Sequence, residues 1–216
     1  RLRRQRDLLD WYRRQGRDLP WRATRDPYRI LVSEIMLQQT QVDRVIPFYE
    51  RFLAEFPDAT ALAAASDERI HRAWKGLGYP SRVERLRAAC RLVGERGAWP
   101  DTPEGLRELP GLGPYTSGSV AVFAFARPVA VVDTNVARVY ARRDGLSLPI
   151  DRAALWDHAA AEVSHEDPIR YTNALMDLGA LVCTARVAHC GRCPWRGHCR
   201  SAGDEDAREA TANPLK

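Results

Sequence analysis

The sequence contains very little lysine: Lys75 and Lys216 are its only lysines, and arginine supplies the rest of its 33 basic residues. Few side-chain amines are therefore available for chemistry that begins with an amine nucleophile. No apolar run approaches the roughly 18 residues of a membrane-spanning helix, and no signal of charged, apolar and small residues opens the chain. We expect a cytoplasmic protein that has no membrane partner.

Cysteine is also scarce, and four of the five cysteines lie close together near the C-terminus. Cys183, Cys190, Cys193 and Cys199 follow a C-x6-C-x2-C-x5-C spacing, whereas Cys90 lies in an apolar run and is expected to be a buried small hydrophobe. One soft metal centre can bind four thiolates at once, whereas two disulfides would need fixed pairwise geometry. Structural zinc sites usually combine two C-x2-C pairs, and only one is present here. We therefore favour a [4Fe–4S] cluster, with zinc as the alternative.

The size and charge of the chain indicate the kind of partner it has. Its 216 residues are enough to bury a core. The net charge of +5 suits a polyanionic partner such as nucleic acid. A GC-rich genome would also favour arginine codons, but planar guanidinium groups suit bidentate contacts with phosphate. We expect a monomer that binds a polyanion.

Apolar residues recur at helical spacing along almost the whole chain, and proline and glycine separate the segments. The expected helices cover residues 27–39, 42–56, 66–77, 81–95, 116–126, 135–143, 151–163 and 168–183, with a further capped helix that begins near Thr102. Only residues 129–132 have the pattern of a strand. The sequence therefore predicts an all-α fold.

A glycine-rich turn, Leu109-Pro-Gly-Leu-Gly-Pro-Tyr-Thr116, lies between two of these helices. Gly111 and Gly113 allow a sharp backbone turn, and the helix that follows presents free N–H groups and its positive dipole end to an anion. A helix-hairpin-helix holds a DNA phosphate in this way. The alternative is a corner between two helices that has no ligand.

These segments together resemble a known superfamily. The hairpin, then Val132-Asp-Thr-Asn-Val136, then the four cysteines, is similar to the helix-hairpin-helix DNA glycosylases that carry an iron–sulfur cluster, the superfamily of endonuclease III. Further segments resemble the MutY adenine glycosylases: Leu19-Pro-Trp-Arg22, Ser33-Glu-Ile-Met-Leu-Gln-Gln-Thr-Gln-Val42, Gly76-Leu-Gly-Tyr79 and Leu178-Gly-Ala-Leu-Val-Cys183. The motifs occur in the family's order and span nearly the whole chain.

The resemblance implies a two-lobed, all-α fold with a C-terminal iron–sulfur cluster loop. We expect one six-helix lobe over residues 25–132, which contains the hairpin, and a second lobe formed by residues 1–24 and 133–216. The implied function is base excision repair, in which the enzyme removes adenine mispaired with 8-oxoguanine or guanine. Its partner would be double-stranded DNA with a mismatched or damaged base pair, which would associate the protein with the nucleoid.

Cleavage of an N-glycosidic bond needs a proton for the departing base and a negative charge near the sugar as it becomes cationic. Glu34 and Asp133 are the best candidates to converge on such a bond. Glu34 is flanked on its helix by Ile30, Leu31, Leu37 and Gln38, and we expect this largely apolar face to raise the pKa of the Glu34 carboxyl and keep it protonated. Asp133 precedes a helix, so N-capping is its alternative role, and the two roles are compatible.

Lysine separates the two mechanistic classes of this superfamily. The bifunctional members attack the sugar with a lysine that follows the hairpin, form a Schiff base and then cut the strand. Here Tyr115 takes that position, Lys75 lies far away in sequence and Lys216 is the last residue. We therefore expect a monofunctional glycosylase that uses water as the nucleophile and leaves an abasic site.

The resemblance also assigns roles to single residues. Glu34 would be the general acid and Asp133 would stabilise the sugar cation or bond to it transiently, while Tyr115 and Asn135 would support the sugar and the water. The expected base-pocket and duplex-inserting residues are Arg22, Leu37, Gln39, Tyr79 and Asn173, and the expected phosphate-binding residues are Gly111 and Gly113. Among these, an aromatic plane and a planar amide suit the filling of the gap that a flipped base leaves.

Two positions depart from the MutY pattern and keep alternatives open. Asn173 stands where many members place a glutamate that hydrogen-bonds adenine, although an amide can also pair with that edge, and Pro80 replaces a second tyrosine.

The thymine mismatch glycosylases of the superfamily are similarly short and also place tyrosine after the hairpin. A glycosylase for thymine or uracil opposite guanine is therefore the alternative function. A DNA-binding module without catalysis is a second alternative, against which Glu34 and Asp133 argue.

Overall fold

The computed structural model is built from helices joined by turns, and it describes residues 1–146, 149–211 and 214. Within these residues no strand is formed, and one isolated bridge pairs Cys183 with Ala188. The all-α fold predicted from the sequence is confirmed. No helix in the described part of the chain combines the length and the apolar character that crossing a membrane requires.

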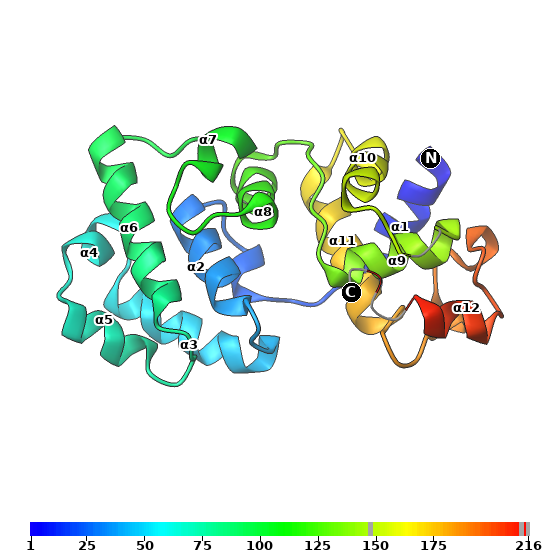
Figure 1. The fold of residues 1–216 in the computed structure, drawn as a ribbon, viewed down its shortest axis with the longest axis horizontal. Coiled ribbons are helices and arrows are strands. Elements are labelled where there is room, and N and C mark those ends of the chain that lie inside the picture. The colour runs from blue at the N-terminus through cyan, green and yellow to red at the C-terminus, as the bar shows by residue number, and fades with distance from the viewer. Residues whose placement is uncertain (147–148, 212–213, 215–216) are drawn as a thin grey trace. The chain divides into compact units, whose positions relative to one another are not determined.

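The chain divides into two compact units, which we call the hairpin unit, Asp18–Arg127, and the cysteine unit, Arg1–Arg17 with Pro128–Lys216. The hairpin unit begins at residue 18 and ends at residue 127, whereas the sequence predicted that this lobe begins at 25 and ends at 132. The N-terminal helix therefore belongs to the same unit as the C-terminal cysteines, and Figure 1 shows it in blue among helices coloured from green to red.

The hairpin unit has helix α2 at its centre. Its elements are the short helix η1 (Pro20–Arg22) and helices α2 (Pro27–Leu37), α3 (Val42–Glu55), α4 (Ala59–Ala64), α5 (Asp67–Trp74), α6 (Ser81–Arg96), α7 (Pro103–Arg107) and α8 (Pro114–Phe125). Helix α2 packs against α3, α6 and α8, and all of its residues from Ile30 to Met36 are buried. Asp26 begins the helix by accepting the Tyr28 N–H at 2.9 Å, and Pro27 fits its first turn. A helix surrounded in this way can hold a side chain away from solvent.

The cysteine unit packs α11 against α1 and α9. Its elements are α1 (Leu2–Gln15), α9 (Thr134–Asp144), α10 (Arg152–Glu162), α11 (Pro168–Leu181), the short helices η2 (Cys190–Arg192) and η3 (Arg196–His198), and α12 (Glu205–Ala210). Leu8, Tyr140 and Leu178 lie in its apolar core. Trp195 joins them from residues 183–199, which carry the four clustered cysteines and which we call the cysteine segment. The segment that carries the cysteines is thus anchored in the helical core.

Residues 129–132 do not form the expected strand. Val131 and Val132 are buried, at 4% and 6% exposure, but the described residues offer them no neighbouring strand. The apolar run therefore reflects the burial of an extended connection into α9, because a short apolar run signals burial as readily as sheet pairing.

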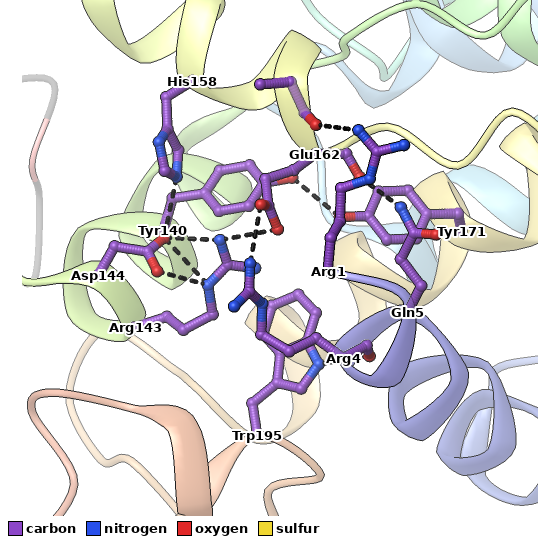
Figure 2. Close-up of polar contacts among 11 residues, drawn as sticks. Arg1, Arg4, Gln5, Tyr140, Arg143, Asp144, His158, Glu162, Tyr171 and Trp195 are labelled. Atoms are coloured by element: carbon purple, nitrogen blue, oxygen red, sulfur yellow. Dashed lines mark hydrogen bonds and ion pairs between the residues drawn. The ribbon is translucent and has the colours of Figure 1, made fainter.

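A buried network of charges links the cysteine segment to three helices of its unit (Figure 2). Nη2 of Arg143 lies 2.7 Å from Asp144 Oδ2 and 3.1 Å from Glu162 Oε2, and the Arg143 side chain is only 2% exposed. Its guanidinium also contacts the rings of Tyr140 and Trp195, at 4.9 and 4.6 Å from the ring centroids. Arginine is suited to this place because its planar group stacks and hydrogen-bonds at the same time.

Helices α1 and α10 complete this network. Nη2 of Arg4 lies 2.9 Å from Glu162 Oε1, and His158 Nε2 lies 2.9 Å from Asp144 Oδ2. The indole N–H of Trp195 donates to the carbonyl oxygen of Arg4 at 2.8 Å. The N-terminal helix thus holds the cysteine segment directly as well as through the charges.

Replacing Arg143 by methionine is expected to lower the free energy of unfolding by about 3 kcal/mol, because it leaves Asp144 and Glu162 with fewer cationic partners. Urea unfolding measures the change. The matched control is Arg170→Met in the same unit, which removes an exposed arginine 3.4 Å from Asp167 and should cost less than about 1 kcal/mol. Equal losses in the two variants would contradict a stabilising role for the buried network.

Candidate active site and cysteine loop

Glu34 lies in the middle of the buried helix α2 and is 6% exposed. Its neighbours along the helix, Ile30, Leu31 and Ile35, are buried too. Glu34 is therefore a buried glutamate, and Ile30 and Leu31 of the flank expected from the sequence are buried with it. Its catalytic role stays a prediction.

Asp133 caps the N-terminus of α9, and both of its carboxylate oxygens accept hydrogen bonds. Oδ1 accepts the Val136 backbone N–H at 2.7 Å, and Oδ2 accepts the Asn135 side-chain amide at 3.0 Å. The capping role weighed from the sequence is confirmed. These two bonds fix the direction of a half-buried carboxylate.

A chain of hydrogen bonds continues from Asp133 to the first of the four clustered cysteines, Cys183. Asn135 Oδ1 accepts from Nη2 of Arg138 at 2.7 Å. The Arg138 guanidinium also donates to the backbone carbonyls of Gly179 and Cys183, both at 2.8 Å. Arg138 is 4% exposed, and burial lowers its pKa from the usual arginine value. Sequence pattern alone does not identify this arginine, which fixes the Asn135 amide and therefore the carboxylate beside it.

Gly179 allows α11 to approach α9 closely at this point. A Cβ atom at Gly179 would lie 2.7 Å from Asn135 Cβ and 3.0 Å from the Asn135 carbonyl oxygen. A contact with backbone at that distance forces the two helices apart. Glycine is therefore required here for the Asn135 amide to keep its place between Asp133 and Arg138.

The glycine-rich turn joins α7 to α8 as the hairpin pattern predicts. Gly111 has a φ of 84°, and a Cβ atom there would lie 2.8 Å from Arg85 Cβ. Gly113 is the N-cap of α8, and Pro114 follows in the first turn. Tyr115 comes next and is half-buried. The turn therefore leads into the N-terminus of a twelve-residue helix, which is the end of a helix that attracts anions.

Two expected DNA-contacting residues, Gln39 and Tyr79, lie on exposed turns of the hairpin unit. Both have a positive φ, 59° for Gln39 and 48° for Tyr79, and Tyr79 is 61% exposed. Leu37 is the last residue of α2 and Arg22 belongs to η1, both half-buried. Asn173, in the cysteine unit, is 7% exposed on α11. The hairpin unit thus carries most of the residues expected to contact the base and the duplex.

The four clustered cysteines line one pocket of the cysteine unit. None of them forms a disulfide. Among the described residues, no three cysteine, histidine, aspartate or glutamate side chains lie close enough together to hold one metal ion. Cys90 lies apart in the hairpin unit, where it is 1% exposed and burial raises its pKa to about 12. Its expected role as a buried small hydrophobe is confirmed.

Arginine side chains face the sulfur atoms in this pocket. Nη1 of Arg142 lies 3.5 Å from Cys183 Sγ, and Nη1 of Arg208 lies 3.5 Å from Cys190 Sγ. Burial raises the pKa of Cys193 to about 12. A buried thiol binds metal as a thiolate only where positive charge compensates it. The guanidinium groups and a metal centre would together supply that charge.

The sequence matches known repair proteins over most of its length. Residues 32–152 match the model of the HhH-GPD superfamily base excision DNA repair proteins. The chain is 43% identical over 204 residues to the adenine DNA glycosylase of Mycolicibacterium smegmatis, covering 91% of this chain and 69% of that one. It is 41% identical over 211 residues to the adenine DNA glycosylase of Rattus norvegicus, covering 91% and 41%. The chain thus spans between about one third and about two thirds of the length of the curated relatives it matches.

Solved structures share the fold. The structure of a thermostable thymine-DNA glycosylase superposes with a TM-score of 0.87 at 30% identity, covering 94% of this chain and 97% of that one. A trapped endonuclease III–DNA covalent intermediate superposes with a TM-score of 0.80 at 20% identity, covering 94% and 95%, which shows the common fold alone. With the family model matched over more than half of its residues and adenine DNA glycosylases among its relatives, the chain belongs to the HhH-GPD superfamily of base excision DNA repair proteins, within the family of the adenine DNA glycosylases.

Proposed function

We propose that the protein is a monofunctional DNA glycosylase that removes adenine paired with 8-oxoguanine or guanine. The observation that carries the proposal is the difference in burial between two carboxyl groups, because Glu34 is only 6% exposed on α2 whereas Asp133 is half-buried and accepts hydrogen bonds at both oxygens. Different environments suit a protonated acid and an ionised carboxylate, which are the two groups that N-glycosidic cleavage needs. The identity of 41–43% to adenine DNA glycosylases supports adenine as the base.

In the proposed reaction Glu34 donates its proton to a ring nitrogen of adenine as the bond from N9 to C1′ of the sugar breaks. The bonding electrons leave with the base, and the negative charge of Asp133 stabilises the cationic sugar. Water then adds to C1′ and gives its proton to the Glu34 carboxylate, which restores the acid and leaves an abasic site. Tyr115 and Asn135 would support the sugar and the water.

The remaining site residues would bind the DNA. Arg22 and Asn173 would contact the extruded adenine, and the buried amide of Asn173 can both donate to and accept from its edge. The amides at Gly111 and Gly113 would hold a backbone phosphate. Leu37, Gln39 and Tyr79 would fill the opened duplex.

The absence of strand cleavage is part of the proposal. Tyr115 occupies the hairpin position, and Lys75 follows α5 as its C-cap on an exposed turn. Lys216 lies outside the described residues. Tyrosine cannot form a Schiff base, so water is the proposed nucleophile.

We further propose that Cys183, Cys190, Cys193 and Cys199 hold a [4Fe–4S] cluster. The donor set fits, because four free thiols line one pocket that guanidinium groups also face. A single zinc ion held by four thiolates at about 2.3 Å is the alternative, and metal analysis separates it from the cluster. When bound, the cluster would fix the shape of the loop, on which the exposed Arg186, Arg192 and Arg196 are available to a DNA backbone.

Thymine is the second candidate base, and the thymine-DNA glycosylase structure with a TM-score of 0.87 favours it. Thymine leaves as an anion that hydrogen bonds can stabilise, so its removal depends less on a protonated acid. Adenine leaves readily only when a ring nitrogen is protonated. The buried Glu34 therefore favours adenine over thymine.

One panel of duplexes tests the proposed function. The protein is incubated with A opposite 8-oxoguanine, A opposite G, T opposite G, U opposite G and matched A–T, and alkali then reveals abasic sites. We expect product from the two adenine mismatches, no strand cleavage before alkali and no trapping by borohydride. Faster release of thymine would establish the second candidate instead, and no product from any duplex would indicate a binding module.

Replacing Cys193 by serine is expected to remove the iron and the visible absorption while leaving the helical signal largely intact, because the helices have apolar faces of their own. Iron and sulfide analysis of anaerobically prepared protein, together with circular dichroism, measures both. Cys90→Ser is the matched control, since Cys90 lies in the other unit and its variant should keep the iron. Stoichiometric zinc without iron in the unmodified protein would contradict the cluster.

A further inference from the structure

Two exposed turns of the hairpin unit have a backbone conformation that is unfavourable for residues with side chains. Gln39 follows α2 with a φ of 59°, and Tyr79 precedes α6 with a φ of 48°. The left-handed region crowds Cβ against the backbone, so these turns need contacts that hold them. The side chains that would enter the DNA duplex thus stand on turns whose backbone conformation is unfavourable without contacts from other residues.

One buried side chain, Arg82 in the first turn of α6, joins the two turns. It is 7% exposed. Its Nη1 donates to the end of α2 and the turn that follows, where the acceptors are the carbonyls of Ile35 at 3.0 Å, Met36 at 3.3 Å and Gln38. Its Nη2 donates to the other turn, at the carbonyls of Leu77 at 2.7 Å and Gly78 at 3.1 Å. A single planar group therefore satisfies backbone acceptors on both sides.

Aromatic rings enclose the Arg82 guanidinium. Its Cζ lies 5.6 Å from the ring centroid of Tyr79 and 5.6 Å from that of Trp74. The Trp74 indole N–H donates in turn to the Gly78 carbonyl at 3.1 Å. The Tyr79 ring, which is the exposed one, therefore rests on the group that also holds the turn of Gln39.

We propose that Arg82 is a positioning residue that holds Gln39 and Tyr79 as one rigid pair for insertion into the DNA duplex. The inference rests on the proposed function, in which both side chains fill the gap left by a flipped base. Fixing the two turns before binding reduces the ordering that insertion requires. A lysine would not replace the arginine, because one ammonium group has no fork that spans both turns.

The first test compares Arg82→Lys with Arg91→Lys, the same change at an exposed arginine of α6 whose Nε donates to the Ala63 carbonyl at 3.2 Å. The probe is a duplex with 2-aminopurine beside the adenine opposite 8-oxoguanine, which brightens when the bases unstack. With protein saturating, the unmodified protein and Arg91→Lys should raise the fluorescence and Arg82→Lys should not. In Arg82→Lys the ratio of the affinity for mismatched DNA to the affinity for matched DNA should fall at least about tenfold. The affinity for matched DNA should change little.

The outcomes separate this inference from the proposed function. A normal fluorescence rise and a normal mismatch preference in Arg82→Lys would overturn the role of Arg82 while adenine excision by the unmodified protein still stood. If the unmodified protein neither unstacked nor released adenine, the proposed function would fail by itself. In that case hydrogen exchange, which needs no DNA, would show whether Arg82 joins the two turns.

Hydrogen exchange of the unmodified protein is the second test of the inference. It does not require a variant to fold. The Thr40 amide donates to the Leu37 carbonyl at 3.3 Å in one turn, and the Leu77 amide donates to the Trp74 carbonyl at 3.1 Å in the other. If Arg82 joins the turns, both amides should open in one step and show the same protection. Protection factors that differ by more than about tenfold would show independent opening and overturn the inference.

Discussion

Replacement of Glu34 by glutamine is expected to slow adenine excision by about 10³-fold or more, because it removes the proton that the departing base needs. Glutamine has nearly the shape of glutamic acid, so the buried position in α2 should remain filled and the fold intact. Binding of the mismatch should therefore change little. Single-turnover excision from A opposite 8-oxoguanine, measured beside the dissociation constant of the same duplex, separates the chemical step from binding.

Glu50→Gln is the matched control for this experiment. Glu50 lies on α3 of the same unit and is exposed, so its variant should excise adenine at the normal rate. Excision by Glu34→Gln at more than a small fraction of the normal rate would contradict the role of Glu34 as acid. A loss of mismatch binding equal to the loss of rate would instead indicate that Glu34 shapes the site and does not transfer a proton.

The sequence predicted the fold where regular apolar spacing extends over several turns. The helices expected at 42–56 and 81–95 correspond to α3 and α6 within a residue at each end. Helices α4 and α12 were not expected, because six residues are too few to show a period. Helix α1 was also missed: arginines dominate its sequence, and its burial depends on α11, which lies far away along the chain.

Parts of the candidate site that depend on local pattern could likewise be predicted. The burial of Glu34 and the capping by Asp133 follow from the residues next to them along the chain. The buried arginines Arg82 and Arg138 could not be identified, because each also donates to backbone carbonyls of residues more than forty positions away along the chain. In a chain so rich in arginine, residue type alone does not distinguish a buried guanidinium from one in solvent.

Replacement of Asp133 by asparagine is expected to reduce excision by on the order of 10²–10³-fold, because the negative charge that stabilises the sugar cation is lost. Asparagine is as good an N-cap as aspartate, so α9 should keep its beginning and the free energy of unfolding should change little. Asp151→Asn is the matched control, since Asp151 caps α10 in the same unit by accepting the Ala153 N–H at 3.1 Å. That variant should excise adenine normally.

Charge and orientation can be separated at this position. An asparagine at 133 that keeps its oxygen on the Val136 N–H turns its own amide toward that of Asn135, so the variant loses a hydrogen bond as well as the charge. Asn135→Ala removes the same hydrogen bond and keeps the aspartate at 133. If charge at Asp133 dominates, Asn135→Ala should lose only about tenfold in single-turnover rate. Equal losses in the Asp133 and Asn135 variants would mean that Asn135, through the direction it gives the carboxylate or through its own support of the sugar and the water, matters as much as the charge of Asp133.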